Sequence, residues 1–238
     1  QTPFDDGNID LVISDELGRI QVNALVAFPD GKDYKPAQRD LWFRFIGMLL
    51  MEQQMDASSP VKDISDPGEL INPIKDWLDS GDNDAITGLS GAENDYYQNL
   101  KPPYSCGNGP FRHIDELMLV KGITPEIFKS VDAKISGLSN YLTVYGASKS
   151  DKKFTFDGKI NLNTAELPVV AALLPIDQIF LAPEICDFRI ENANGQFIHE
   201  LTNPAWYKEV PGCSDLQINP DLITNKSDVF RIQCNGVL

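Results

Sequence analysis

The residues of this chain whose types and spacing could do chemistry are concentrated in one acidic segment, residues 76–95. The carboxylates of the segment are those of Asp76, Asp79, Asp82, Asp84, Glu93 and Asp95, and the adjacent Lys75 is the only basic residue beside them. A cluster of oxygens with so little compensating charge suits a hard cation, and Ca²⁺, which takes about six to eight oxygen ligands, suits it best. Composition alone leaves a second interpretation open, because runs of charge usually form solvated loops.

Three glycines in the same segment would let it curl, so that carboxylates from both of its ends face one point. The spacing excludes an EF-hand. If Asp82 is the first residue of such a loop, Ile86 stands at the fifth position, which needs an oxygen ligand, and Thr87 stands at the glycine position.

The charge of the whole chain narrows the class of partner. The formal net charge is −15, which repels phosphate backbones and anionic membrane surfaces and favours metal cations or basic protein faces. No stretch approaches the ~18 apolar residues of a membrane span. Gln1 opens into polar sequence, so the chain is either a cytosolic protein or an ectodomain whose anchor precedes residue 1.

The sequence contains little that resembles a catalytic constellation. His113 and His199 are the only histidines, neither has a partner at ligand spacing, and we expect both to be surface or capping residues. Patterns for a serine nucleophile, a zinc protease or a nucleotide-binding loop are absent. A carboxylate pair could still act as acid and base, so a calcium-stabilised secreted hydrolase remains an alternative.

The four cysteines, Cys106, Cys186, Cys213 and Cys234, have no C-x-x-C spacing and no nearby histidine. A zinc or redox motif is therefore disfavoured, and an oxidising compartment fits better. The favoured pairing is Cys213 with Cys234, because each ends a short segment of the same C-terminal region. Buried free thiols are the alternative.

The elements that must position the acidic segment are predominantly helices. Apolar residues at helical spacing predict a helix over residues 38–55, and cap signals at 65–68 begin another that runs through Trp77. A further helix is predicted over 114–120. Thr124 and Pro125 have the N-cap and first-turn chemistry that opens one more.

Alternating apolar residues predict strands at both ends of the chain. A hairpin is predicted over residues 9–23, and strands over 141–145 and 154–156 flank a lysine-rich turn at 148–153. Cap chemistry at 163–166 opens a helix that Pro175 ends. The C-terminal third is predicted to be a sheet module, with strands at 188–190, 196–199 and 229–233. The order of elements indicates an α+β fold with a helical block inserted into it.

Two segments have the pattern of helix-hairpin-helix units, residues 115–126 and residues 160–165 with 173–176. In nucleic-acid-binding versions, hairpin glycines expose N–H groups that hold a phosphate. Here Thr124 replaces the second glycine of the first unit, and the second unit has no hairpin glycine. A structural helical hairpin is therefore favoured over a helix-hairpin-helix nucleic-acid-binding protein.

Several segments, in this order along the chain, resemble the K-type minor pseudopilin of type II secretion, the general secretion pathway protein K family. They are residues 14–25 (SDELGRIQVNAL), 76–79 (DWLD), 91–97 (GAENDYY), 102–104 (PPY), 114–122 and 160–165. The resemblance covers about residues 9–175, and residues 227–236 look like a closing pilin strand. Residues 186–225 show no resemblance.

The resemblance implies a pilin-like antiparallel sheet module formed by residues 1–28 and 137–238. A large helical domain, SAM-like or helix-hairpin-helix-like, is expected to be inserted at 29–136 and to contain the acidic calcium segment 76–95. It also implies a non-enzymatic subunit that assembles with the I- and J-type minor pseudopilins at the tip of the periplasmic pseudopilus. In the full-length protein, a hydrophobic helix that precedes this chain would anchor the subunit in the inner membrane.

Calcium is the cofactor that the resemblance implies. The matching ligands are Asp79, Glu93 and Asp95, with Asp82 and Asp84 as further candidates and Asn108 as a weaker one. Family members usually have Glu-Asp where this chain has Glu93-Asn94-Asp95, which leaves the place of the second carboxylate open.

Overall fold

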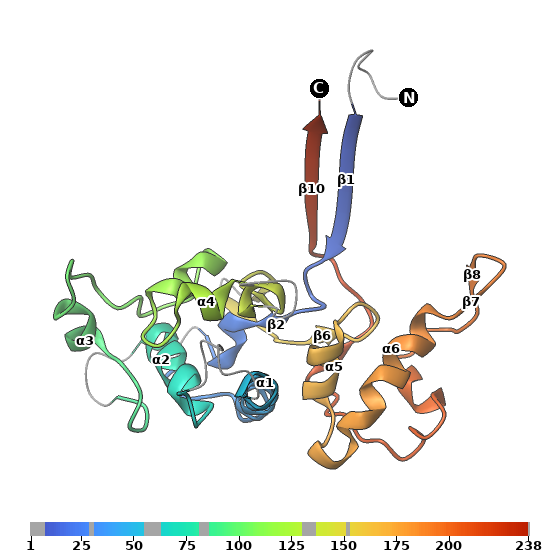
Figure 1. Cartoon of the computed structure of the whole chain (residues 1–238), viewed down its shortest axis with the longest axis horizontal. Coiled ribbons are helices and arrows are strands. Elements are labelled where there is room, and N and C mark those ends of the chain that lie inside the picture. The colour runs from blue at the N-terminus through green and yellow to red at the C-terminus, as the bar shows by residue number, and fades with distance from the viewer. Residues whose placement is uncertain are drawn as a thin grey trace.

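The computed structural model describes residues 8–28, 31–54, 63–80, 86–129, 137–150 and 153–237. Helices and short strands occur together, in agreement with the predicted α+β class. Figure 1 shows helices on both sides of the base of a projecting two-stranded ribbon. None of the helices in the described ranges is both long enough and apolar enough to cross a membrane.

Most of the predicted helices are present. The α-helices are α1 (Pro36–Gln54), α2 (Gly68–Leu78), α3 (Asn94–Gln98), α4 (Pro125–Phe128), α5 (Leu167–Leu173) and α6 (Ala182–Ile190). The 3₁₀ helices are η1 (Val22–Leu25), η2 (Ile114–Leu119), η3 (Leu138–Asn140), η4 (Ile176–Leu181) and η5 (Trp206–Glu209). The helix predicted over 38–55 is confirmed as α1 as far as Gln54, and residue 55 lies outside the described residues. The helices predicted after the cap signals at 65–68 and 163–166 are confirmed as α2 and α5, and the segment 114–120 forms 3₁₀ turns.

The strands are β1 (Asn8–Asp15), β2 (Ile20–Gln21), β3 (Leu142–Thr143), β4 (Ala147–Ser150), β5 (Lys153–Phe156), β6 (Ile160–Asn161), β7 (Asn192–Ala193), β8 (Gln196–Phe197), β9 (Ile223–Thr224) and β10 (Phe230–Val237). In the described residues they form five two-stranded sheets. The pairs β1–β10, β4–β5 and β7–β8 are antiparallel, and the pairs β2–β3 and β6–β9 are parallel.

The predicted hairpin over residues 9–23 is wrong. β1 pairs with β10, at the other end of the chain, and places Leu11 opposite Cys234 and Ile13 opposite Ile232. After the turn, the N–H of Ile20 donates to the carbonyl of Tyr141, so the chain joins β3 and does not return along β1. The strand predicted at 229–233 is confirmed as part of β10.

The predicted strand at 188–190 is also wrong, because these residues end helix α6. Pro183 stands in the first turn of α6, and the buried Ala182 and Ile185 are three residues apart on one helical face. Phe188 continues that face and stacks on Trp206, with 5.9 Å between the ring centroids. The strand predicted at 196–199 is confirmed in part by β8.

The two predicted helical hairpins have different outcomes. In the first, η2 is followed by Gly122, whose φ of 85° lies in the left-handed region, and then by α4. The hydroxyl of Thr124 accepts the N–H of Ile127, as its predicted capping role requires. The second hairpin prediction is wrong, because residues 160–161 form strand β6, which pairs with β9.

The core around the acidic segment is formed by the apolar faces of α1 and α2. Its fully buried members are Leu41, Trp42 and Phe45 of α1 with Ile71, Ile74 and Leu78 of α2, and the helical spacing of both sets follows from the sequence pattern. The other side of α1 faces α5, where the guanidinium of Arg44 donates to the carbonyl of Ala172 at 2.8 Å.

A buried asparagine joins three distant parts of the chain. The Asn23 amide donates to the carbonyls of Phe111 and Val144, each at 3.0 Å, and accepts the N–H of Phe111 at 2.8 Å. Because Asn23 is fully buried, these bonds replace all contact with water. They fix the helical region to the segments that precede and follow it.

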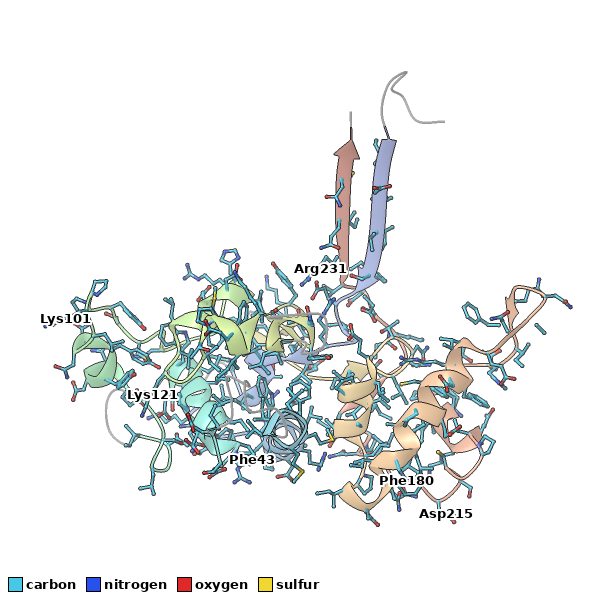
Figure 2. All side chains as sticks on the ribbon, in the orientation of Figure 1. Phe43, Lys101, Lys121, Phe180, Asp215 and Arg231 are labelled. Atoms are coloured by element: carbon cyan, nitrogen blue, oxygen red, sulfur yellow. The ribbon has the colours of Figure 1, made fainter. Side chains whose placement is uncertain are left out.

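The ribbon of β1 and β10 is attached at its base by a buried carboxylate. Glu16 accepts a hydrogen bond from Arg231 Nε at 2.5 Å and from the Thr143 hydroxyl at 2.7 Å. Arg19 Nη1 lies 3.4 Å from the same carboxylate. Figure 2 shows Arg231 at the base of the ribbon, which otherwise projects away from the body.

The predicted Cys213–Cys234 disulfide is wrong, since all four cysteines are free thiols. Cys213 is buried in the turn after η5, whereas Cys234 is exposed on β10 of the ribbon. The alternative of free thiols, buried for Cys106 and Cys213, is the one observed.

Replacing Glu16 by Gln tests the attachment of the ribbon. We expect Glu16→Gln to lower the free energy of unfolding by about 2 kcal/mol, because a buried charge-assisted pair loses one of its charges. Urea denaturation measures the loss, and faster exchange of the β1 and β10 amide hydrogens should accompany it. Glu200→Gln, at an exposed position, is the control. Equal midpoints for the two variants would contradict this role of Glu16.

Candidate metal site

The C-terminal end of α2 places two carboxylates on one side of the helix. Asp76 and Asp79 are three residues apart, a spacing that brings side chains together on a helical surface. Both are buried, with exposed fractions of 0% and 3%. Asp79 ends the helix: its N–H donates to the carbonyl of Lys75, and its own backbone is extended.

The Asp76 carboxylate binds the backbone of the loop that follows. Its two oxygens lie 3.2 and 3.1 Å from the N–H nitrogen of Thr87, and Oδ2 accepts the N–H of Ala92 at 2.8 Å. A Cβ at Gly91 would lie 2.2 Å from Asp76 Oδ2, so only glycine permits this approach. Burial raises the pKa of Asp76, and the two N–H donors and Lys75 act in the opposite direction.

These hydrogen bonds bring a third carboxylate to the end of α2. Glu93 follows Ala92 directly, precedes α3, and is itself buried. Asp76, Asp79 and Glu93 each offer one oxygen, and these three oxygens lie within 4.8 Å of one another. We refer to these three residues as the carboxylate cluster.

An aromatic group borders the carboxylate cluster. The Trp77 ring contacts Tyr97 edge to face, with 5.1 Å between centroids, and stacks on Phe111 at 6.1 Å. Cys106 lies in the same region, with its Sγ 3.7 Å from the carbonyl oxygen of Asp76. Burial raises the pKa of the Cys106 thiol to about 11, so at neutral pH the thiol is protonated.

The structure brings together only some of the predicted ligands. Asp79 and Glu93 belong to the cluster, whereas Asp82 and Asp84 lie outside the described residues. Asp95 is exposed in the first turn of α3, and Asn108 is exposed with a φ of 44°; neither is in the cluster, and both remain predicted ligands.

Asp76 is the member of the cluster that the sequence analysis did not place among the ligands. The sequence contained a signal for this role of Asp76, because a carboxylate three residues before Asp79 on a predicted helix must lie on nearly the same face. The positions of the backbone N–H groups that it binds could not be read from any spacing.

The donor set fits a hard divalent cation. Three buried carboxylates supply only oxygen, the ligand that Ca²⁺ prefers, and residues 81–85 contain two more acidic side chains between α2 and Ile86. The end of α2 is also the negative end of the helix dipole, where carboxylates are unfavourable unless a cation accompanies them. Lys75 provides one positive charge, with its Nζ 2.5 Å from Asp79 Oδ2 and 3.9 Å from Asp76 Oδ1.

Both histidines have the surface or capping roles predicted for them. The backbone N–H of His113 donates to the carboxylate of Glu116 at the start of η2. His199 Nε2 lies 2.8 Å from an oxygen of Glu191, and the imidazole stacks on Phe188. Neither histidine belongs to the carboxylate cluster.

Three known proteins with similarity to this chain belong to type II secretion systems. A sequence model of the family described as "Type II secretion system (T2SS), protein K" matches residues 18–139. Type II secretion system protein K of Pseudomonas aeruginosa is 27% identical over 179 residues, which cover 74% of this chain and 44% of that protein. Its counterpart from Aeromonas hydrophila is 26% identical over 174 residues, 72% of this chain and 45% of that protein. The chain thus spans less than half the length of these relatives.

A similar fold is found in the crystal structure of the GspK–GspI–GspJ complex from the type 2 secretion system of enterotoxigenic Escherichia coli. One chain of that structure superposes with a TM-score of 0.63 at 14% identity, over 99% of this chain and 71% of that chain. At this identity the likeness establishes the fold only. The family match, which covers just over half of the residues, establishes the relationship: the chain belongs to the protein K family of the type II secretion system.

Proposed function

We propose that this chain is the periplasmic part of a non-enzymatic minor pseudopilin, located at the tip of the type II secretion pseudopilus. The observation that carries the proposal is membership of the protein K family, together with a fold shared with a chain of the GspK–GspI–GspJ complex. By this proposal its partners are the I- and J-type minor pseudopilins, and its role in protein secretion is assembly.

The projecting ribbon supports a pilin-like module. The register places Ile9, Leu11 and Ile13 on the same face as Phe230, Ile232 and Cys234. Leu11, Ile13 and Ile232 are 58%, 60% and 65% exposed, so this face is apolar and uncovered. In the proposed full-length protein, a hydrophobic helix preceding residue 1 anchors the subunit in the inner membrane and packs on this face. Residues 29–136 are the domain inserted into the module.

We further propose that calcium binds at the carboxylate cluster and stabilises the inserted domain. Asp79 and Glu93 come from opposite ends of the acidic segment, so one ion that binds both closes the segment into a loop. Asp82, Asp84 and Asp95 are the candidates for the remaining ligands, with Asn108 as a weaker one. Asp76 faces the same point but is already bound to two backbone N–H groups, so we assign it the positioning of the loop.

Two other classes of function are less well supported. A helix-hairpin-helix nucleic-acid-binding protein needs basic surfaces and phosphate-binding hairpins, whereas the net charge is −15 and residues 160–161 form a strand. A calcium-stabilised hydrolase would need a general base that is free to accept a proton. Asp76 and Asp79 are instead engaged with backbone N–H groups and with Lys75.

The partner assignment is tested by mixing this chain with the periplasmic parts of the I- and J-type minor pseudopilins of the same organism. We expect one ternary complex, because the family membership and the shared fold support assembly with these partners. Size-exclusion chromatography with light scattering measures the mass of the complex. Separate elution of the three proteins at micromolar concentration would contradict the proposal.

The calcium assignment is tested by thermal unfolding in calcium and in chelator. A ligand at 100 times its Kd stabilises the native state by about 2.7 kcal/mol, which raises the Tm of a chain of this size by about 5–10 °C. We expect Glu93→Gln and Asp79→Asn to abolish most of this difference, because each removes a charged ligand. Asp95→Asn should reduce it only if Asp95 binds the ion.

The control for these variants is Asp187→Asn, which removes an exposed carboxylate from α6. It should retain the full difference in Tm. Identical Tm values in calcium and in chelator for the unsubstituted chain would exclude a calcium site that stabilises the fold.

A further inference from the structure

Lys75 is a buried cation aimed into the carboxylate cluster. It precedes Asp76 on α2 and is four residues before Asp79, so its side chain can reach the end of its own helix. Its Nζ lies 2.5 Å from Asp79 Oδ2 and 3.9 Å from Asp76 Oδ1, and only 9% of the residue is exposed. A lysine with this little exposure is normally found only where it is paired.

The ammonium group of Lys75 occupies the position that a metal ion bound to Asp79 would take. Asp79 is one of the proposed calcium ligands, and a calcium ion binds carboxylate oxygen at about 2.3–2.6 Å. The ammonium already lies at a comparable distance from Asp79 Oδ2. Two cations cannot share one carboxylate oxygen inside a buried site without strong repulsion, because the low polarity of the surroundings screens little of it.

A second lysine shows that ammonium groups hold this loop elsewhere as well. Lys121 Nζ donates to the carbonyls of Ser90 and Gly91, at 3.0 and 3.2 Å, and lies 5.1 Å from the centre of the Tyr96 ring. Figure 2 shows Lys121 beside α2. The two lysines have different partners: Lys121 binds neutral carbonyls, whereas Lys75 binds the carboxylates.

We propose that Lys75 regulates the metal site as an internal counter-cation. Its ammonium neutralises part of the carboxylate cluster while no metal is bound, and it withdraws from Asp79 when a divalent cation enters. The inference rests on the proposed calcium site and adds two properties to it. The metal-free chain is stabilised by the contacts of Lys75 with Asp76 and Asp79, and the affinity for calcium is lower than the carboxylates alone would give.

The test replaces Lys75 by Met, which keeps the length and apolar stem of the side chain and removes its charge. Calcium chloride titrations by calorimetry give the affinity, and thermal unfolding in calcium and in chelator gives the stability. We expect Lys75→Met to bind calcium at least tenfold more tightly than the unsubstituted chain. Its Tm in chelator should fall, so the difference between the two conditions should widen.

Two further variants separate the charge from the substitution itself. Lys75→Arg keeps the positive charge and should retain the weaker calcium affinity. Lys101→Met removes an exposed lysine and should leave both quantities unchanged. If Lys75→Met folds only with calcium, the midpoint of folding in calcium buffers, followed by circular dichroism, gives its affinity.

The outcomes distinguish this inference from the calcium proposal on which it rests. Equal or weaker calcium binding by Lys75→Met, with clear binding by the unsubstituted chain, overturns the role of Lys75 and leaves the site in place. Absence of calcium binding in both chains overturns the site, and the role of Lys75 with it. Tighter binding by Lys75→Met, with Lys75→Arg unchanged, supports both.

Discussion

The hydrogen bonds from the backbone of residues 87 and 92 to the Asp76 carboxylate are the contact on which the acidic segment depends. A fully buried carboxylate is costly unless hydrogen bonds or charges replace its water, so the side chain and the loop become ordered together. Because Ala92 is held against α2, the next residue, Glu93, comes close to Asp79. The geometry of the cluster is therefore a consequence of one anion bound by backbone N–H groups.

The negative charge of two buried acidic centres in the described residues is compensated in different ways. At the base of the ribbon, one carboxylate, Glu16, has two arginines and a hydroxyl as partners. At the end of α2 there are three carboxylates. Lys75 is the one cation among the described residues that lies within 4.0 Å of any of them. The helix dipole adds negative potential there. The first centre is a structural anchor, whereas at the second the described residues place one lysine beside three carboxylates, and the calcium proposal draws on this arrangement.

Local signals in the sequence predicted local structure well. The helices α1, α2, α4 and α5 follow from apolar spacing with cap residues, because both act within a few turns of the chain. The partner of β1 could not be predicted, since alternation shows that a segment is a strand but not which segment pairs with it. The pairing of β1 with β10 joins the two ends of the chain. The end of α6 was misread because three residues cannot separate a period of two from one of 3.6.

The sequence predicted which residue types form the candidate site, but not what each residue does in it. The density of carboxylates and the glycines indicated a cluster, and Asp79 and Glu93 do meet in it. Asp76 binds the backbone, and Lys75 reaches into the cluster. Both contacts depend on where α2 ends and on the path of the loop that follows it, and no spacing rule predicts either. The four-residue helical interval from Lys75 to Asp79 was the only local sign that Lys75 reaches into the cluster.

Because Asp79 ends α2 and Glu93 precedes α3, any cation held between them fixes the relative direction of these helices. By the calcium proposal, such a cation would determine the shape of the helical region without taking part in a reaction.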